Sequence, residues 1–391
     1  MKLCITILVA ITFWMPISAK ETSRLRVKKV SVIESNNKLL DENVSTIPFT
    51  ADLADSYITD LKQYVSRRVN STDKSDPAII LSLLEWVSNQ WQHDGVNAPP
   101  ARANALEILT LAAQGGRFSC NSYSTVLSDV LLAYGYISRV ISLNSKDIAY
   151  GTLGMGHVAV EVWSNSLQKW IFIDPQYSVY ATYHGEYLNY YDIYRLRAES
   201  KYNEIEFHVA NSHLTINHQT KDEAIAQYRS FLSEYFGYIV TPYEHAESIS
   251  MLVLPMESKD QFLTNQGRTS YPLVFTEEPE DFYFSINTTL VVFTQGTCTL
   301  DRKHSDTRPF FEETEKSAGQ GIPESNFTLQ LRNNMPWFDH YEYKNKNNVW
   351  VSTKHSTLPW KVSDGVSTFT VRAVNMAGVA GVPTSIKLKY E

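Results

Sequence analysis

The chain has 391 residues, a net charge of −7, and 43% hydrophobic and 12% aromatic residues. This composition excludes general disorder and predicts full-sized hydrophobic cores in two or three domains. Nucleic acid is not an expected partner, because its binding needs a concentrated basic surface and the longest basic cluster is the short RLRVKK over 24–29.

Residues 1–19 are predicted to be a signal peptide. Lys2 precedes a continuous apolar stretch that ends in Ser18 and Ala19, and polar KETSR follows at once. An uncleaved membrane anchor is the alternative, but the stretch falls short of the about 20 residues of a bilayer span and Pro16 interrupts it. We therefore expect an exported protein, periplasmic, on the cell surface or secreted, without stable membrane insertion after cleavage.

Two amphipathic helices are predicted after a lead-in over residues 20–76, which we expect to wrap the domain that follows. The first starts at Pro77 and repeats apolar residues at helical spacing as far as Trp91. The second is NALEILTLAAQ, residues 104–114, and two glycines end it.

A third helix is predicted from Ser119 or its neighbour to Gly135, which places Cys120 at a helix N-terminus. A thiol attacks only as thiolate, and amide donors together with the positive end of the helix dipole favour that form. Cys120 is therefore a candidate nucleophile, and it needs a histidine that the fold brings within hydrogen-bond reach.

Three short strands follow, at 138–143, 157–163 and 169–174, so helices precede a mostly antiparallel sheet. Pairing Val160 with Ile173, and residue 162 with 171, puts the apolar side chains of the last two strands on one face. In that register His157 and Asp174 share the other face as diagonal neighbours, whose Cβ atoms lie within about 7–8 Å. The sequence thus predicts a histidine oriented by a carboxylate. Taken alone, His157 would be a hydrogen-bonded strand residue and Asp174 a cap of the turn at Pro175.

Three blocks of the sequence resemble the transglutaminase-like superfamily: GGRFSCNSYSTVLSDVLLAYGYISRVI, GHVAVEVW and KWIFIDPQY. The resemblance covers roughly residues 77–200 and implies a Cys-His-Asp triad, which carries over to Cys120, His157 and Asp174. It also implies helices packed on an antiparallel sheet, as in papain-like and transglutaminase-like cysteine enzymes. Tyr123 departs from the pattern, since many members have a smaller residue there, and it could narrow the pocket.

The C-terminal half differs in character. Residues 201–275 contain an amphipathic helix at 221–237 and are predicted to be a helical connecting region. Residues 276–391 show short alternating strands separated by turn residues, which is typical of a β-sandwich. Two of its segments, NNMPWFDHYEY and VRAVNMAGVAG, resemble β-sandwich modules of the immunoglobulin or fibronectin type. The expected fold class is α+β, with a catalytic domain over 77–200 followed by an immunoglobulin-like β-sandwich.

Acyl transfer develops an oxyanion, and the resemblance implies that the N–H of the nucleophile stabilises it together with an upstream side-chain donor. Trp91 and Gln114 are the candidates, although core packing suits the first and a helix end the second. The tyrosines over 187–194 follow helical spacing and could line a substrate groove, although core packing is the preferred interpretation. No metal-binding or nucleotide-binding motif is present in the sequence, and we expect no cofactor or metal.

The leading hypothesis is a thiol acyl-transfer enzyme that acts on a carboxamide or a peptide bond of a protein, peptide or glycopeptide, with hydrolysis favoured over transamidation. The alternative is a non-catalytic exported binding or scaffold protein that recognises glycan or protein. A disulfide between Cys120 and Cys298 is a third possibility, because only these two cysteines remain after signal cleavage. Oligomeric state is not predicted.

Overall fold

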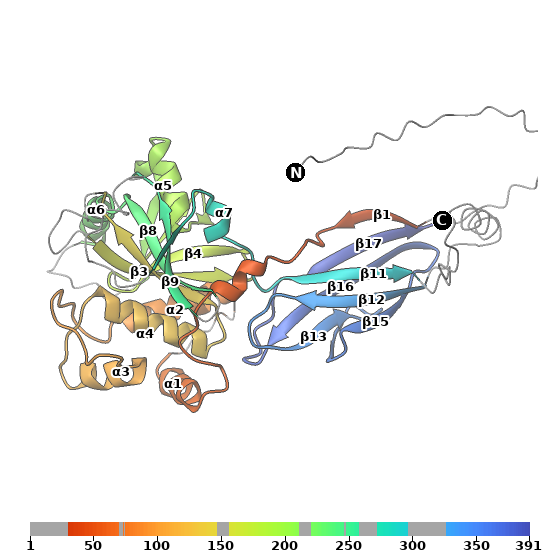
Figure 1. Ribbon diagram of the computed structural model, residues 1–391, viewed down its shortest axis with the longest axis horizontal. Coiled ribbons are helices and arrows are strands. Elements are labelled where there is room, and N and C mark those ends of the chain that lie inside the picture. The colour runs from red at the N-terminus through yellow and green to blue at the C-terminus, as the bar shows by residue number, and fades with distance from the viewer. Residues whose placement is uncertain are drawn as a thin grey trace, which may run out of the picture.

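The computed structural model describes residues 30–69, 73, 75–146, 156–210, 220–245, 248–257, 272–295 and 326–391. The predicted signal peptide, Cys4 and Cys298 lie outside these residues. Within them the chain forms two halves that lie end to end along the long axis (Figure 1). We call residues 42–286 the α+β half, and β1 together with residues 289–391 the strand half.

Four helices form one layer of the α+β half: α1 (Ser56–Ser66), α2 (Asp76–Ser88), α3 (Ala105–Ala113) and α4 (Cys120–Ala133). The apolar stripes predicted from helical spacing are buried, and α4 contributes ten buried residues. Helix α4 packs on the sheet, where Val126, Leu127 and Val130 share one core with Val160 and Ile171. The predicted order, helices and then a mostly antiparallel sheet, is confirmed.

The sheet of this half has nine strands, in the order β10-β9-β8-β2-β3-β4-β5-β6 with β7 also on β5. They are β2 (Ser138–Asn144), β3 (Gly156–Ser164), β4 (Lys169–Asp174), β5 (Val179–Tyr183), β6 (Glu186–Tyr187), β7 (Glu206–Val209), β8 (Tyr238–His245), β9 (Ser248–Pro255) and β10 (Leu273–Phe275). Val160 pairs with Ile173 and Val162 with Ile171, which is the predicted register.

The other face of the sheet is covered by α5 (Tyr190–Ala198) and α6 (Lys221–Leu232), and the short 3-10 helix η2 (Tyr202–Glu204) lies between them in the chain. The prediction of a helical connecting region over 201–275 is therefore wrong, because four segments of this region are strands β7–β10 of the same sheet. These strands are short or interrupted, as by Pro242 in β8, and they do not carry a long alternating pattern.

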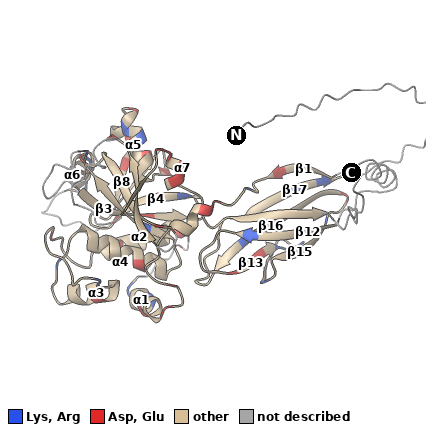
Figure 2. Cartoon of the chain, viewed as in Figure 1, with Lys and Arg blue, Asp and Glu red and all other residues tan. Residues whose placement is uncertain are grey.

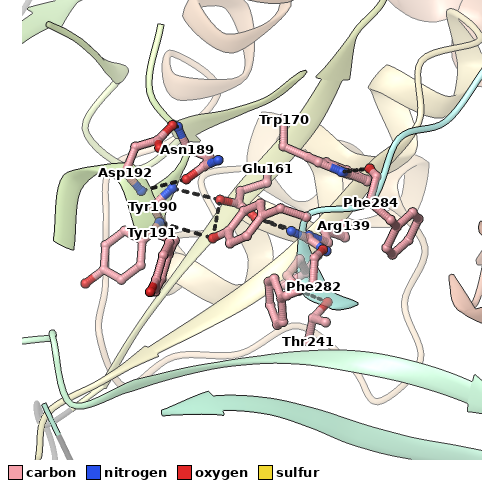
Figure 3. A network of polar contacts seen from close by, with 12 residues as sticks. Arg139, Glu161, Trp170, Asn189, Tyr190, Tyr191, Asp192, Thr241, Phe282 and Phe284 are labelled. Atoms are coloured by element: carbon pink, nitrogen blue, oxygen red, sulfur yellow. Dashed lines mark hydrogen bonds and ion pairs between the residues drawn. The ribbon is translucent and has the colours of Figure 1, made fainter. Parts of the chain in front are cut away.

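A buried polar network joins this sheet to the segment that leads into the strand half (Figure 3). Arg139 of β2 binds Glu161, its direct partner on β3, with the side chains 5% and 0% exposed. Arg139 Nη1 also donates to the carbonyl of Phe282 in α7 (Pro279–Phe282), at 2.5 Å. The indole N–H of Trp170 donates to the carbonyl of Phe284 at 2.9 Å. The network fixes the entry segment against β2, β3 and β4.

The strand half has two sheets around one core, consistent with the predicted β-sandwich. One sheet has the order β1-β17-β16-β13-β14, and the other β11-β12-β15. Their bounds are β1 (Val30–Ser35), β11 (Thr289–Gln295), β12 (Asn326–Asn333), β13 (Phe338–Lys344), β14 (Trp350–Thr353), β15 (Thr357–Lys361), β16 (Gly365–Asn375) and β17 (Thr384–Tyr390).

The lead-in over 20–76 does more than wrap the α+β half. Its strand β1 pairs with β17 near the C-terminus, whereas its 3-10 helix η1 (Glu42–Thr46) and α1 belong to the α+β half. Pairing across more than 350 residues leaves no local trace in the sequence, so the sequence pattern predicted a single lead-in.

The two halves meet at the C-terminal end of α4. Asn375 of β16 donates from Nδ2 to the carbonyl of Gly135 at 2.9 Å, in a buried contact. Gly135 has φ +83, and a Cβ there would lie 2.5 Å from the side chain of Ala377 and 2.9 Å from that of Val379. The glycine predicted to stop the helix thus also permits the close approach of the strand half.

Charged residues are spread over both halves, with acidic and basic positions interspersed (Figure 2). Among the helices within the described residues, none combines the length and the apolar character needed to span a bilayer.

Candidate active site

Cys120 is the first residue of α4, and its thiol is free and half-buried. Ser119, the N-cap, makes no side-chain capping bond, so the first-turn N–H groups are not occupied by that side chain. The residues just before α4 are held in place by the segment before α3. Asp94 N and Trp91 Nε1 both donate to the carbonyl of Phe118, at 3.0 and 3.3 Å.

His157 and Asp174 lie side by side at the end of the sheet nearest Cys120. His157 Nε2 is 2.7 Å from Asp174 Oδ2, and the two side chains are 3% and 0% exposed. His157 stands near the start of β3 and Asp174 is the last residue of β4, so the predicted diagonal relationship produces this contact. The remaining ring nitrogen, Nδ1, is left for the thiol.

The carboxylate of Asp174 is fully engaged. Its Oδ1 accepts the N–H groups of Gln176 and Tyr177, at 3.0 and 3.4 Å, and so caps the turn after β4. Its Oδ2 accepts from His157 and from the hydroxyl of Tyr228 on α6, at 2.9 Å. Asp174 therefore serves as a turn cap and as a histidine partner together. Tyr228 was not predicted as part of the site, because nothing local in the sequence marks a helix tyrosine 54 residues downstream.

Aromatic rings enclose the imidazole. The centroid of His157 is 5.0 Å from that of Phe231 in an edge-to-face contact, 5.9 Å from that of Tyr177 and 6.1 Å from that of Tyr235. Phe231 lies on α6, Tyr235 shortly after it, and Tyr177 after β4. This enclosure excludes water from the His157–Asp174 contact and strengthens it.

The titration behaviour of the pair follows from these contacts. Burial by itself lowers the pKa of His157, but the charge and hydrogen bond of Asp174 and the nearby thiolate of Cys120 outweigh it and raise the pKa to about 9. Burial by itself raises the pKa of Cys120, yet the hydrogen bond and charge of His157 and the N–H of Val158 bring the pKa below its ordinary value. The raised pKa of His157 and the lowered pKa of Cys120 both favour a thiolate–imidazolium pair.

His93 is a second histidine in the field of this site. Its pKa is lowered first by desolvation and then by the charge of His157, while Asp94 and Asp174 act in the opposite direction. His93 is not among the residues predicted from the sequence to form the site.

Residues 63–175 match the family model described as the transglutaminase-like superfamily. The chain contains a transglutaminase-like domain. Proteins of this superfamily are generally cysteine-based acyl-transfer enzymes. Among solved structures, the chain is similar to the transglutaminase of red sea bream, with 12% identity and a TM-score of 0.27 over 89% of this chain. The match spans 60% of that protein. The comparison with curated proteins found no match.

Within the transglutaminase-like domain, the two predicted oxyanion candidates are placed as follows. Trp91 is 8% exposed, stacks on Tyr123 at 4.3 Å between ring centroids, and uses its indole N–H on Phe118. Gln114 is the C-cap of α3 and is exposed. Trp91 therefore packs in the core and Gln114 ends a helix, which are the structural roles that the sequence also suggested.

Tyr123, the residue that could have narrowed a pocket, packs inside the transglutaminase-like domain. It is 2% exposed and donates its hydroxyl to the carbonyl of Trp91 at 2.6 Å, so its ring belongs to the core. The tyrosines after residue 186 also pack inward: Tyr190 is 0% exposed, and Tyr194 donates to the carbonyl of Met256. The helix starts only at Tyr190, so Tyr187 lies in β6 and stacks on Tyr180.

Among the described residues, no three His, Cys, Asp or Glu side chains lie close enough together to hold a metal ion.

Proposed function

We propose that the chain is a thiol acyl-transfer enzyme in which Cys120 is the nucleophile, His157 the acid and base, and Asp174 the residue that orients the histidine. The observation that carries the proposal is the 2.7 Å contact between His157 Nε2 and Asp174 Oδ2 beside a cysteine at a helix N-terminus. Because Asp174 occupies Nε2, the Nδ1 atom is the one available to exchange a proton with the thiol.

The proposed reaction has two steps, acylation of Cys120 and hydrolysis of the resulting thioester. The Cys120 thiolate attacks the carbonyl carbon of a carboxamide or peptide bond, His157 transfers its Nδ1 proton to the departing amine, and the C–N bond breaks to leave a thioester. Water then attacks the thioester while His157 takes one of its protons, and the thiolate leaves as the carboxylic acid forms. The N–H of Cys120 is one donor for the oxyanion, since it opens α4 and lies outside the helix hydrogen-bond ladder.

We favour hydrolysis over transamidation, because water is always present and no amine-binding subsite has been identified. Incubating the protein with glutamine-containing and asparagine-containing peptides in ¹⁸O-labelled water, with and without a primary amine, distinguishes the two by mass spectrometry. Incorporation of ¹⁸O into a carboxylate supports hydrolysis, whereas an amine adduct formed in preference contradicts it.

The activated thiolate is tested by the pH dependence of iodoacetamide alkylation, with the adduct located by mass spectrometry. We expect Cys120 to react with an apparent pKa well below the free value of about 8.5, and this behaviour to be lost in His157→Ala. Slow labelling with an unshifted pKa would contradict the thiolate–imidazolium pair and favour a non-catalytic binding protein. Absence of any labelling in the native protein, with labelling after reduction, would favour the disulfide to Cys298.

Export is part of the proposal and rests on the signal-peptide pattern of residues 1–19. N-terminal sequencing of the protein recovered from cells tests it. A mature terminus close after Ala19 is expected, and a retained Met1 would contradict cleavage.

A further inference from the structure

Tyr228 is a helix residue that reaches the same carboxylate oxygen as the proposed general base. Its hydroxyl lies 2.9 Å from Asp174 Oδ2, the atom that also faces His157. The carboxylate of Asp174 can only accept, and burial together with the charge of Asp174 raises the pKa of Tyr228 well above its ordinary value. Tyr228 is therefore protonated and donates to Asp174.

The position of Tyr228 is fixed independently of this bond. Helix α6 begins in a capping box between Thr220 and Glu223. Arg229, the next residue after Tyr228, donates to the carbonyls of Tyr202 and Ile205, at 2.5 and 2.6 Å. The Tyr202 hydroxyl returns a bond to the carbonyl of Arg229 at 2.8 Å. The helix is thus held on the η2–β7 segment, and the tyrosine is presented to Asp174 by a rigid support.

We propose that Tyr228 is a positioning residue for the catalytic pair, in that its hydroxyl holds Asp174 Oδ2 and takes up part of the negative charge that this oxygen directs at His157. The inference rests on the proposed function and extends it, because α6 lies outside residues 63–175 that match the superfamily model. Helix α6 is then part of the catalytic unit, and a fragment that ends after the family match would lack it.

The hydroxyl of Tyr228 and the imidazole of His157 share one oxygen of Asp174, which decides whether Tyr228 raises or lowers the proton affinity of His157. The hydroxyl proton of Tyr228 brings a positive dipole end to Oδ2, so it weakens the hold of Asp174 on the imidazolium proton. Without it, His157 keeps its proton more strongly, which favours the thiolate of Cys120 but makes the proton harder to give to a leaving amine. Among the described residues, the other titratable groups that face His157 are Cys120, His93, Tyr177 and Tyr235.

The test compares Tyr228→Phe with Tyr190→Phe. Tyr190 is a matched control, because it is fully buried and its hydroxyl donates to the carbonyl of Tyr235 at 2.9 Å, without contact to Asp174. We expect the apparent pKa of Cys120 alkylation to fall by about 0.5 unit in Tyr228→Phe and to stay unchanged in Tyr190→Phe. A 3-fluorotyrosine at position 228, a stronger donor, should move it upward, which keeps the test decisive if the phenylalanine variant folds poorly.

A second readout does not depend on thiol reactivity. The low-field proton resonance of the His157 imidazole, followed by NMR as a function of pH, should move in Tyr228→Phe and not in Tyr190→Phe. If wild type has a lowered thiol pKa and both phenylalanine variants leave the pKa and the resonance in place, the role of Tyr228 is refuted while the proposed function stands. If wild type itself has an ordinary thiol pKa, the proposed function fails first, and the inference that rests on it fails too.

Discussion

Asp174 meets His157 with one oxygen and holds its own turn with the other. Oδ2 lies 2.7 Å from His157 Nε2, while Oδ1 accepts two backbone N–H groups of residues 176 and 177. The carboxylate therefore cannot rotate without breaking the turn. This double engagement is why the imidazole is presented in one orientation.

Replacing Asp174 with asparagine should raise the apparent pKa of Cys120 toward the free value of about 8.5. The new amide can keep its oxygen on the turn, but its NH₂ group then donates to Nε2 of His157. The neutral imidazole must then carry its proton on Nδ1, and a protonated Nδ1 cannot accept the proton of the thiol. Alkylation at pH 6.5 should slow by roughly tenfold or more. Asp129→Asn is the control, since Asp129 is also a buried carboxylate that accepts from a tyrosine but lies away from the pair. Equal labelling of the two variants would argue against the role of Asp174.

The buried carboxyl of Asp129 should make the free energy of unfolding depend on pH. It accepts from Tyr57 at 2.5 Å and from Thr50 at 2.8 Å, but no cation offsets its burial in these contacts, and desolvation raises the pKa of its carboxyl above 3.8. The folded state thus binds the proton more tightly than the unfolded state. This contribution to stability is fully present below pH 3.8 and is lost as the pH rises through the folded pKa.

Asp129→Asn should therefore be at least as stable as wild type at pH 7, because the amide oxygen can accept from Tyr57 and the amide NH₂ can donate to Thr50. Its advantage should shrink as the pH falls. Urea midpoints measured between pH 4 and 8 test this, and a variant that is clearly less stable at pH 7 would refute it.

Gly135→Ala should weaken the junction between the two halves. Alanine would have to adopt φ +83 and would bring its Cβ within 3 Å of Ala377 and Val379. We expect a loss of about 2 kcal/mol or more in the free energy of unfolding. Gly185→Ala is the control, because Gly185 has φ +81 with nothing within 4 Å of its Cβ and so carries the backbone strain alone. If both variants lose the same free energy, the close approach at Gly135 contributes nothing.

Glu161→Gln should destabilise the α+β half strongly. It leaves the buried Arg139 without its anionic partner, and breaking a buried pair in this way typically costs about 3–5 kcal/mol. The pair of Arg372 and Glu342 on the strand half has the same 2.7 Å separation but side chains 25% and 20% exposed, so Glu342→Gln should cost under about 1 kcal/mol. Comparable urea midpoints for the two variants would contradict the importance of the buried network.

Sequence periodicity was enough to predict the core of the site. Helical spacing and Gly135 placed Cys120 at a helix start, and the alternation of valines and isoleucines in two strands fixed the register that brings His157 to Asp174. These features are readable because each depends on contacts between near neighbours in the chain. The hydrophobic pattern of a strand pair allows one register, and the polar face then follows.

The tertiary structure decided what lies around that core. Tyr228 reaches Asp174 from a helix 54 residues away, and β1 joins β17 from the opposite end of the chain. Such contacts depend on how whole elements pack, and the residues that make them carry no local mark, since a tyrosine on a helix face looks the same whether it fills a core or binds a carboxylate. The sequence by itself determined which residues could form a catalytic triad, whereas only the packing of α6 on the sheet determined what encloses the histidine and holds its partner.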